Sequence, residues 1–332
     1  MDESTQKALF RPGQSLLCQI EAAEPGGYRA KLVPSDVDAF LPSRDELEIG
    51  QTVPATFVCM SNNRALMTFA FVIGTTERVQ FGLPSDQETA FAIWTDSYPS
   101  NVKLRRAVDV IMPQVTGKLS QSISCSDLKI SQLLKDLETS KFTGSIKAES
   151  DQVLSRSAAL VFDGRAVGCI YGRRSMPEAH LADRALKFML EDMSLGTTNL
   201  QIYELPREIV LSMSSLFIGC PIHEREASQK DAAHFIEKVL ETLTTKGETA
   251  CVTLSTDERQ SQCLGFLYRG EKHGSFSVID QIFDEDFDQI FQKAREIPDV
   301  MASAYLLPRE MISDSVLLGY SLTTRFPDGS NN

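Results

Sequence analysis

An internal repeat constrains the fold of this chain more than any other feature of its sequence. Apolar and β-branched or aromatic residues flank the dipeptide Asp163-Gly164, and the same pattern recurs around Arg269-Gly270. A glycine at the second position of such a dipeptide can adopt the positive φ that tight hairpin turns require. Each copy therefore predicts two antiparallel strands joined by a tight turn.

The repeat extends well beyond these two hairpins. Apolar and glycine positions recur at a constant offset of 106 residues: Ile130 as Ile236, Leu133 as Val239, Leu134 as Leu240, Leu137 as Leu243, Ile146 as Val252, Phe162 as Tyr268, and Gly168 as Gly274. Farther along, Pro206-Arg207-Glu208 recurs as Pro308-Arg309-Glu310 at an offset of 102 residues. Because this period is too long for a solenoid, it predicts two tandem units of roughly 100 residues each.

The order of elements within each unit predicts an α+β multidomain fold. A small β-barrel is expected over residues 1–75, a linker or helical connector over 76–122, and a polar tail over 326–332. Two repeated α+β domains with small antiparallel sheets are expected over residues 123–222 and 228–325. In the first repeat we expect helices at 128–137 and 177–193, and in the second an amphipathic helix at 282–291.

Composition is that of an ordinary soluble globular protein. The 332 residues include 42% hydrophobic and 23% charged residues, and the formal net charge is −12. This negative net charge argues against a general nucleic-acid binder, although one small domain can still carry a local basic patch. No run approaches the roughly 18 apolar residues of a membrane span, and the N-terminus has no secretory signal. We therefore expect a cytoplasmic location.

The cysteine and histidine patterns favour neither a metal site nor catalysis. Seven cysteines are scattered without a C-x-x-C pair, which predicts reduced, mostly buried thiols. His223, Glu224 and His234 could form a metal site, but a linker with a helix start explains them better. The acidic run at 284–288 could suggest calcium, but it lacks the glycine and the distal glutamate of a calcium-binding loop. No G-x-S-x-G, glycine-rich phosphate loop or zinc spacing occurs, so we expect a protein that is not an enzyme and holds no cofactor.

Residues 10–71 alternate in the manner of a small β-barrel, with strands at 16–20, 28–32, 53–60 and 65–71. Their frame consists of Gly13, Gly27, Phe40-Leu41-Pro42 and Gly50. This pattern resembles the RNA-binding OB-fold repeat of the large ribosomal small-subunit protein and of several ribonucleases, except that Ala39 replaces the usual glycine. The resemblance implies an OB-like barrel.

If the resemblance extends to RNA binding, five residues are the candidate RNA contacts. Tyr28 and Phe40 would be the aromatic residues that stack on bases, and Arg29, Lys31 and Arg64 would contact phosphates. The alternative is a barrel that faces other proteins, in which both rings are partly buried residues of the wall.

The first repeat carries the residues of a second resemblance. These are Leu133-Leu134-x-x-Leu137, Lys141-Phe142-Thr143-Gly144 and Phe162-Asp163-Gly164-Arg165-Ala166-Val167. They are similar to the PATAN (PatA N-terminal type) domain of bacterial signalling proteins; the second copy lacks the Thr-Gly and Asp-Gly pairs and keeps only the pattern. The family implies a non-catalytic bacterial regulator that binds other proteins, often signalling or receiver-domain proteins. An apolar groove between the repeats would be its expected binding surface.

Basic residues gather after both hairpins and offer a different hypothesis. The candidate anion or partner contacts are Arg165, Arg173 and Arg174 in the first repeat and Arg269, Lys272 and His273 in the second. Such a patch can bind an anionic nucleotide second messenger or a phosphorylated partner through the arginine fork. Solvated turn charges are the simpler explanation. The sequence thus predicts an adaptor or scaffold, with an RNA-binding regulator and a nucleotide sensor as the alternatives.

Overall fold

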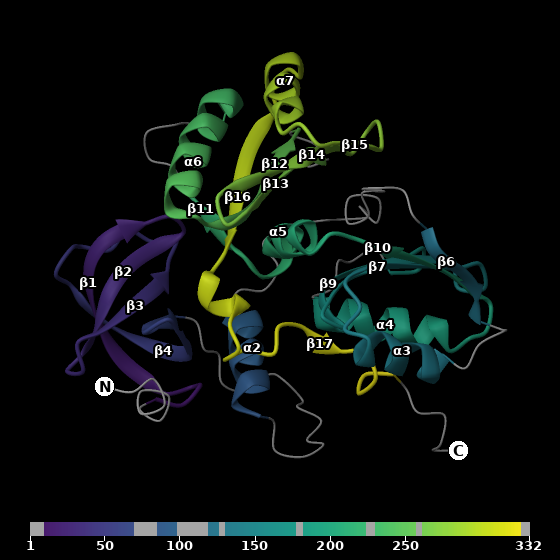
Figure 1. Cartoon of the computed structure of the whole chain (residues 1–332), viewed down its shortest axis with the longest axis horizontal. Helices are drawn as coiled ribbons and strands as arrows, with labels where there is room; N and C mark the ends of the chain where they lie inside the picture. The colour runs from purple at the N-terminus through teal and green to yellow at the C-terminus, as the bar shows by residue number, and fades with distance from the viewer. Residues whose placement is uncertain are drawn as a thin grey trace.

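The computed structural model describes residues 10–69, 85–97, 119–125, 130–176, 182–223, 230–256 and 261–326. These residues form a closed five-stranded barrel and two six-stranded antiparallel sheets with accompanying helices (Figure 1). The predicted α+β class, barrel and small antiparallel sheets are therefore confirmed. The predicted domain boundaries stay predictions, and most of the expected connector at 76–122 lies outside the described residues.

The barrel forms where alternating apolar residues were found in the sequence. Its strands are β1 (Ser15–Glu24), β2 (Gly27–Val33), β3 (Val37–Pro42), β4 (Thr52–Ser61) and β5 (Arg64–Thr68). They follow the order β1-β2-β3-β5-β4, and β1 closes the barrel by pairing with β4. In β1, Cys18 and Ile20 point inward while Leu17 and Gln19 do not, as expected for a strand with one buried face.

The first sheet has the order β17-β9-β8-β7-β10-β6. Its strands are β6 (Leu119–Ser124), β7 (Gly144–Ser150), β8 (Ser155–Phe162), β9 (Arg165–Arg173), β10 (Thr198–Glu204) and β17 (Tyr320–Ser321). Helices α3 (Ile130–Thr139) and α4 (Ala182–Met193) pack on it. Helix α4 lies within the predicted helix 177–193, and α3 extends two residues beyond the predicted end at 137. The first residues of both predicted helices, 128–129 and 177–181, are outside the described part.

The second sheet has the order β11-β16-β12-β13-β14-β15. Its strands are β11 (Cys220–Ile222), β12 (Thr249–Ser255), β13 (Ser261–Tyr268), β14 (Glu271–Ser277), β15 (Ile282–Asp284) and β16 (Met301–Leu307). Helices α6 (Ala232–Lys246) and α7 (Asp288–Glu296) and the 3₁₀ helix η2 (Arg309–Ile312) accompany it. The order β14-β13-β12-β16-β11 matches β9-β8-β7-β10-β6 of the first sheet, so the sequence repeat is also a repeat of topology.

One expectation for the second repeat was wrong. The segment 282–291 was predicted as a single amphipathic helix, but its first three residues form β15 and α7 begins only at Asp288. The difference arises from a contact outside the segment, because β15 pairs with β14 at the end of the sheet. Phe283 lies opposite Phe276 in that pairing. Backbone pairing with a neighbouring strand outweighs a local helical period.

The two hairpin turns are equivalent in atomic detail. Asp163 and Arg269 both have positive φ, 46° and 51°. The N–H of Asp163 donates to Thr143 Oγ1 at 3.1 Å, and the N–H of Arg269 donates to Thr249 Oγ1 at 3.2 Å. Both pairs are related by the offset of 106 residues found in the sequence, so Asp163 and Arg269 occupy the same structural position.

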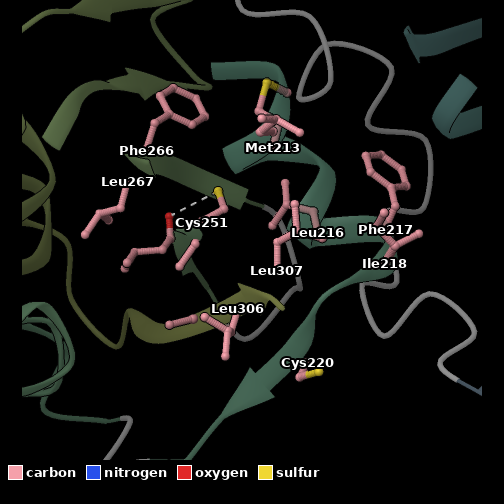
Figure 2. Close-up of a cluster of buried hydrophobic side chains, with 14 of the residues drawn as sticks. Met213, Leu216, Phe217, Ile218, Cys220, Cys251, Phe266, Leu267, Leu306 and Leu307 are labelled. Atoms are coloured by element: carbon pink, nitrogen blue, oxygen red, sulfur yellow. Dashed lines mark hydrogen bonds between the residues drawn. The ribbon is translucent and has the colours of Figure 1, made fainter. Parts of the chain in front are cut away.

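Helix α5 (Arg207–Ile218) lies between the two sheets (Figure 1). All its residues from Ile209 to Ile218 are buried, and it contacts β8 and β9 of the first sheet and β12, β13 and β16 of the second. A helix buried on every side is apolar all round. Figure 2 shows its side chains Met213, Leu216, Phe217 and Ile218 in one buried cluster that also contains Leu306 and Leu307 of β16.

A polar side chain of α5 also holds the second sheet. Ser212 Oγ donates to the carbonyl of Ala250 in β12 at 2.6 Å and accepts from the N–H of Leu267 in β13 at 3.2 Å. Because α5 fills the space between the sheets, the apolar surface expected as a groove between the repeats is a shared core.

Helix α2 (Asp86–Ser97) joins the barrel to this core. Its Trp94 is fully buried, and the indole Nε1 donates to the carbonyl of Ile218 at 2.7 Å. Phe40 and Leu66 of the barrel belong to the same buried cluster as α2, α5 and the second sheet. The barrel wall is therefore packed against the repeats.

Candidate functional site

The two aromatic residues proposed as RNA contacts are not at the surface. Tyr28 is 5% exposed and Phe40 is 3% exposed. Tyr28 lies in the barrel core, where its hydroxyl accepts a hydrogen bond from the Leu47 N–H at 2.9 Å. Phe40 faces the opposite way, into the core shared with α2 and the second sheet. Neither ring is placed to stack on a base.

The three basic candidates on the barrel are each paired with acidic residues. The pairs are Arg29 with Glu21 at 3.2 Å, Lys31 with Asp38 at 3.1 Å, and Arg64 with Glu24 at 2.5 Å. Arg64 also lies 3.7 Å from Glu310 and 5.1 Å from the centre of the Phe40 ring. These carboxylates offset the positive charge that a phosphate backbone requires.

The basic residues of the first repeat have different surroundings from one another. Arg165 Nε donates to the carbonyl of Gly319 at 2.9 Å, and its Nη2 lies 3.5 Å from Glu88. Arg174 is exposed, whereas the Nε of Arg173 is buried and has no hydrogen-bond partner among the described residues. Arg165 therefore holds the C-terminal segment next to β9.

The basic residues of the second repeat lie against aromatic rings. Arg269 is exposed and its guanidinium lies 5.2 Å from the centre of the Tyr268 ring. Lys272 lies 5.5 Å from the centre of the Phe287 ring, and His273 meets Tyr268 edge-on at 6.0 Å. Arg269 thus stands apart from the first group, which the structure places on the other sheet.

Arg269 lines a cleft of about 1020 Å³ between the barrel and the second repeat. The barrel contributes the β4–β5 turn, with Asn62 and Asn63, and the repeat contributes the end of α6, the β13–β14 turn and the residues from Arg309 to Ser315. Lys246 and Arg309 add two further cations. Neither Lys246 nor Arg309 was a candidate binding residue in the sequence, because neither belongs to a local basic run. Arg309 was noted only as part of the repeated Pro-Arg-Glu motif.

A second candidate surface lies at the free edge of β15. Its residues are Ile279, Ile282, Asp284, Glu285 and Asp286, here named the β15 edge surface. Ile279 has the largest exposed fraction of the large hydrophobic side chains that the structure describes, 66%, and Ile282 is 55% exposed. Figure 1 shows β15 at the outer end of the second sheet.

Among the described residues, neither metal-ligating clusters nor cysteine thiols occur at these two surfaces. Within the described ranges, no three His, Cys, Asp or Glu residues gather as a metal site would require. All seven cysteines are buried. Burial raises the pKa of Cys18 to about 12 and that of Cys125 to about 11, so these thiols stay protonated and unreactive near neutral pH.

Among the residues with a described structure, no helix has the length and apolar character needed to cross a membrane. Comparison of the chain with protein-family models, with curated proteins and with solved structures finds no match.

Proposed function

We propose that the protein is a non-catalytic cytoplasmic bacterial adaptor that binds another protein through the β15 edge surface. In this proposal an OB-like barrel and two PATAN-like domains form the scaffold. The observation that carries it is the exposure of Ile279 and Ile282 at an unpaired sheet edge. The alternative of RNA binding gains no support from the burial of Tyr28 and Phe40.

The backbone of β15 is available to a partner. Within the described part of the chain, the strand pairs with β14 on one side, over three residues, and no strand pairs with its other side. An edge strand presents unpaired N–H and C=O groups to which an extended segment of another chain can add. Exposed isoleucines beside such an edge supply apolar contacts that isolated surface residues do not.

The charges around β15 indicate the chemistry of the partner. Three acidic residues lie at the end of the strand: Asp284 is its last residue, and Glu285 and Asp286 follow it. None of the three forms an ion pair with another described residue. By contrast, nearby Asp280 is neutralised by Lys293 at 2.8 Å. Complementary charge favours association and register. The partner is therefore an extended segment in which apolar residues alternate with Lys or Arg.

Binding of a synthetic peptide tests this proposal directly. The probe is a labelled peptide of alternating valine and lysine, and the reference is the same peptide with glutamate in place of lysine. Fluorescence anisotropy of the full chain is expected to show saturable binding of the lysine peptide alone, and hydrogen exchange is expected to show new protection at Ile282–Asp284. Absence of saturable binding would overturn the proposal.

A pair of double variants locates the binding surface. Ile279→Ser with Ile282→Ser is expected to weaken binding of the lysine peptide by about tenfold or more, because two apolar contacts are lost. The control is Leu17→Ser with Val33→Ser, which removes two exposed apolar residues that lie opposite each other on the barrel. Equal weakening in both variants would show that the peptide does not bind at β15.

A further inference from the structure

The internal repeat exposes a charge reversal in the second copy. In the first repeat, the turn residue Asp163 pairs with Arg207, and their Oδ1 and Nη1 atoms are 2.9 Å apart. Asp163 corresponds to Arg269, and Arg207 follows Pro206 as Arg309 follows Pro308. An ion pair in one copy is therefore matched by two cations in the other.

These two cations meet a third in the cleft beside the barrel. Arg269, Arg309 and Lys246 all line it, and among the described lining residues Asp314 is the one with a carboxylate. Arg309 is partly neutralised, since its Nη2 donates to Glu248 at 2.5 Å and to the Lys246 carbonyl at 2.9 Å. No described acidic group pairs with the Lys246 or Arg269 side chain. Like charges gathered in this way destabilise a fold unless a counter-charge joins them.

Asparagine and serine side chains give the rest of the cleft polar groups suited to an anion, beside Met60 and Ile312. Asn62 and Asn63, both at positive φ in the β4–β5 turn, are exposed. No hydrogen bond engages either side-chain amide within the described part of the chain. Ser61 adds a hydroxyl group, whereas the Ser313 hydroxyl donates to the Glu310 carbonyl at 2.6 Å. Arginine forks bind phosphate oxygens in bidentate fashion, and amides and hydroxyls complete the coordination of the remaining oxygens.

We infer that this cleft binds a small ligand with a di- or triphosphate group, held chiefly by Arg269 and Lys246. The ligand contacts the barrel through the β4–β5 turn and the second repeat through α6 and the β13–β14 turn. It therefore links two parts of the molecule that approach each other at this cleft. The site is separate from the β15 edge surface, so it does not depend on the proposed adaptor role.

Calorimetric titration of the full chain at low ionic strength tests the inference, with pyrophosphate, ATP and adenosine as the probes. We expect saturable binding of at least one phosphate-bearing probe and no binding of adenosine. Binding of pyrophosphate and ATP with similar affinity assigns recognition to the phosphate group alone. If ATP binds and pyrophosphate does not, the polar walls of the cleft recognise the nucleoside as well as the phosphate group. If neither phosphate probe binds, or if adenosine binds equally well, the inference is wrong.

One substitution distinguishes a lost site from a damaged fold. Arg269→Asp recreates in the second repeat the pair that Asp163 forms with Arg207 in the first. We expect it to lower phosphate affinity by about tenfold or more while leaving the melting temperature unchanged or raised. The control is Arg156→Gln, which removes an exposed arginine on β8 that pairs with Glu149. Equal loss of affinity in Arg156→Gln, or undiminished affinity in Arg269→Asp, would overturn the inference.

Discussion

Glu138 at the end of α3 and Thr323 beyond β17 are joined by two hydrogen bonds. Thr323 Oγ1 donates to Glu138 Oε2 at 2.7 Å, and the Thr323 N–H donates to Oε1 at 3.2 Å. Ser321 Oγ and the Leu322 N–H also donate to Oε1, at 2.7 and 2.6 Å. One carboxylate from the first repeat thus holds the end of the chain that follows the second repeat, next to the strand pairing of β17 with β9.

This arrangement predicts acid sensitivity of the C-terminal segment. Burial alone would raise the pKa of Glu138, but the hydrogen bonds from Ser321, Leu322 and Thr323 outweigh it and lower the pKa below the usual 4.5. A carboxyl with a depressed folded-state pKa contributes stability above its unfolded pKa, and this contribution is lost as pH falls through the folded value. Hydrogen exchange is therefore expected to show loss of protection in residues 319–326 as the pH is lowered below 4.5.

The variant Glu138→Gln is expected to lose part of that protection already at pH 7, with a cost of about 1 kcal/mol because the site is only partly buried. Its unfolding midpoint in urea should also depend less on pH between neutral and acid conditions. Glu241→Gln on the exposed face of α6, where the carboxylate pairs with Lys238 at 3.8 Å, is the matched control. Identical behaviour of the two variants would contradict the role assigned to Glu138.

Close packing of α5 on β9 predicts the effect of adding one methyl group. A Cβ at Gly168 would lie 2.4 Å from Cδ2 of Phe217, whereas a Cβ at Gly172 on the same strand would meet nothing closer than the Arg156 carbonyl oxygen at 3.8 Å. Gly168→Ala should therefore lower the free energy of unfolding by about 1–3 kcal/mol through overpacking. Gly172→Ala should change it little. Urea unfolding followed by circular dichroism measures both, and equal effects would show that α5 does not lie this close to β9.

The buried indole of Trp94 should make α2 contribute to the free energy of unfolding of the core. Trp94→Phe removes the donor to the Ile218 carbonyl and leaves a smaller ring in a fully buried site. The expected loss is about 2 kcal/mol of unfolding free energy, from the hydrogen bond and the packing together. Urea unfolding followed by circular dichroism measures it. An unchanged midpoint would mean that α2 does not contribute to the stability of the core.

Burial of every cysteine predicts protected thiols. The native chain at pH 8 should react slowly or not at all with a chromogenic thiol reagent, because burial raises the pKa of groups such as Cys18 and Cys263 to about 12. In denaturant, all seven thiols should react. Rapid reaction of one or more thiols in the native protein would show that its site opens to solvent.

Local features of the fold could be predicted from the sequence because they depend on neighbours in the chain. The turns at Asp163 and Arg269 follow from the glycine that comes after each residue, and the apolar stripe of α3 follows from its period. The barrel strands follow from alternation of apolar residues. Repetition of these signals at a fixed offset predicted that the two sheets would share one topology. The prediction of one helix over 282–291 was wrong because β14, outside that segment, pairs with residues 282–284.

The candidate sites depended on contacts between residues far apart in the sequence. Arg269, Lys246 and Asn62 reach one cleft from three separate segments, and no local pattern relates them. Burial of Phe40, which the sequence made a candidate RNA contact, follows from the packing of the barrel against α2 and the second sheet. Short-range backbone preferences and periodicity made the turns, most strands and most helices predictable from the sequence, with the helix expected at 282–291 as the exception. Only the tertiary structure decided which charges are paired and which surfaces stay open, because both depend on how distant segments pack.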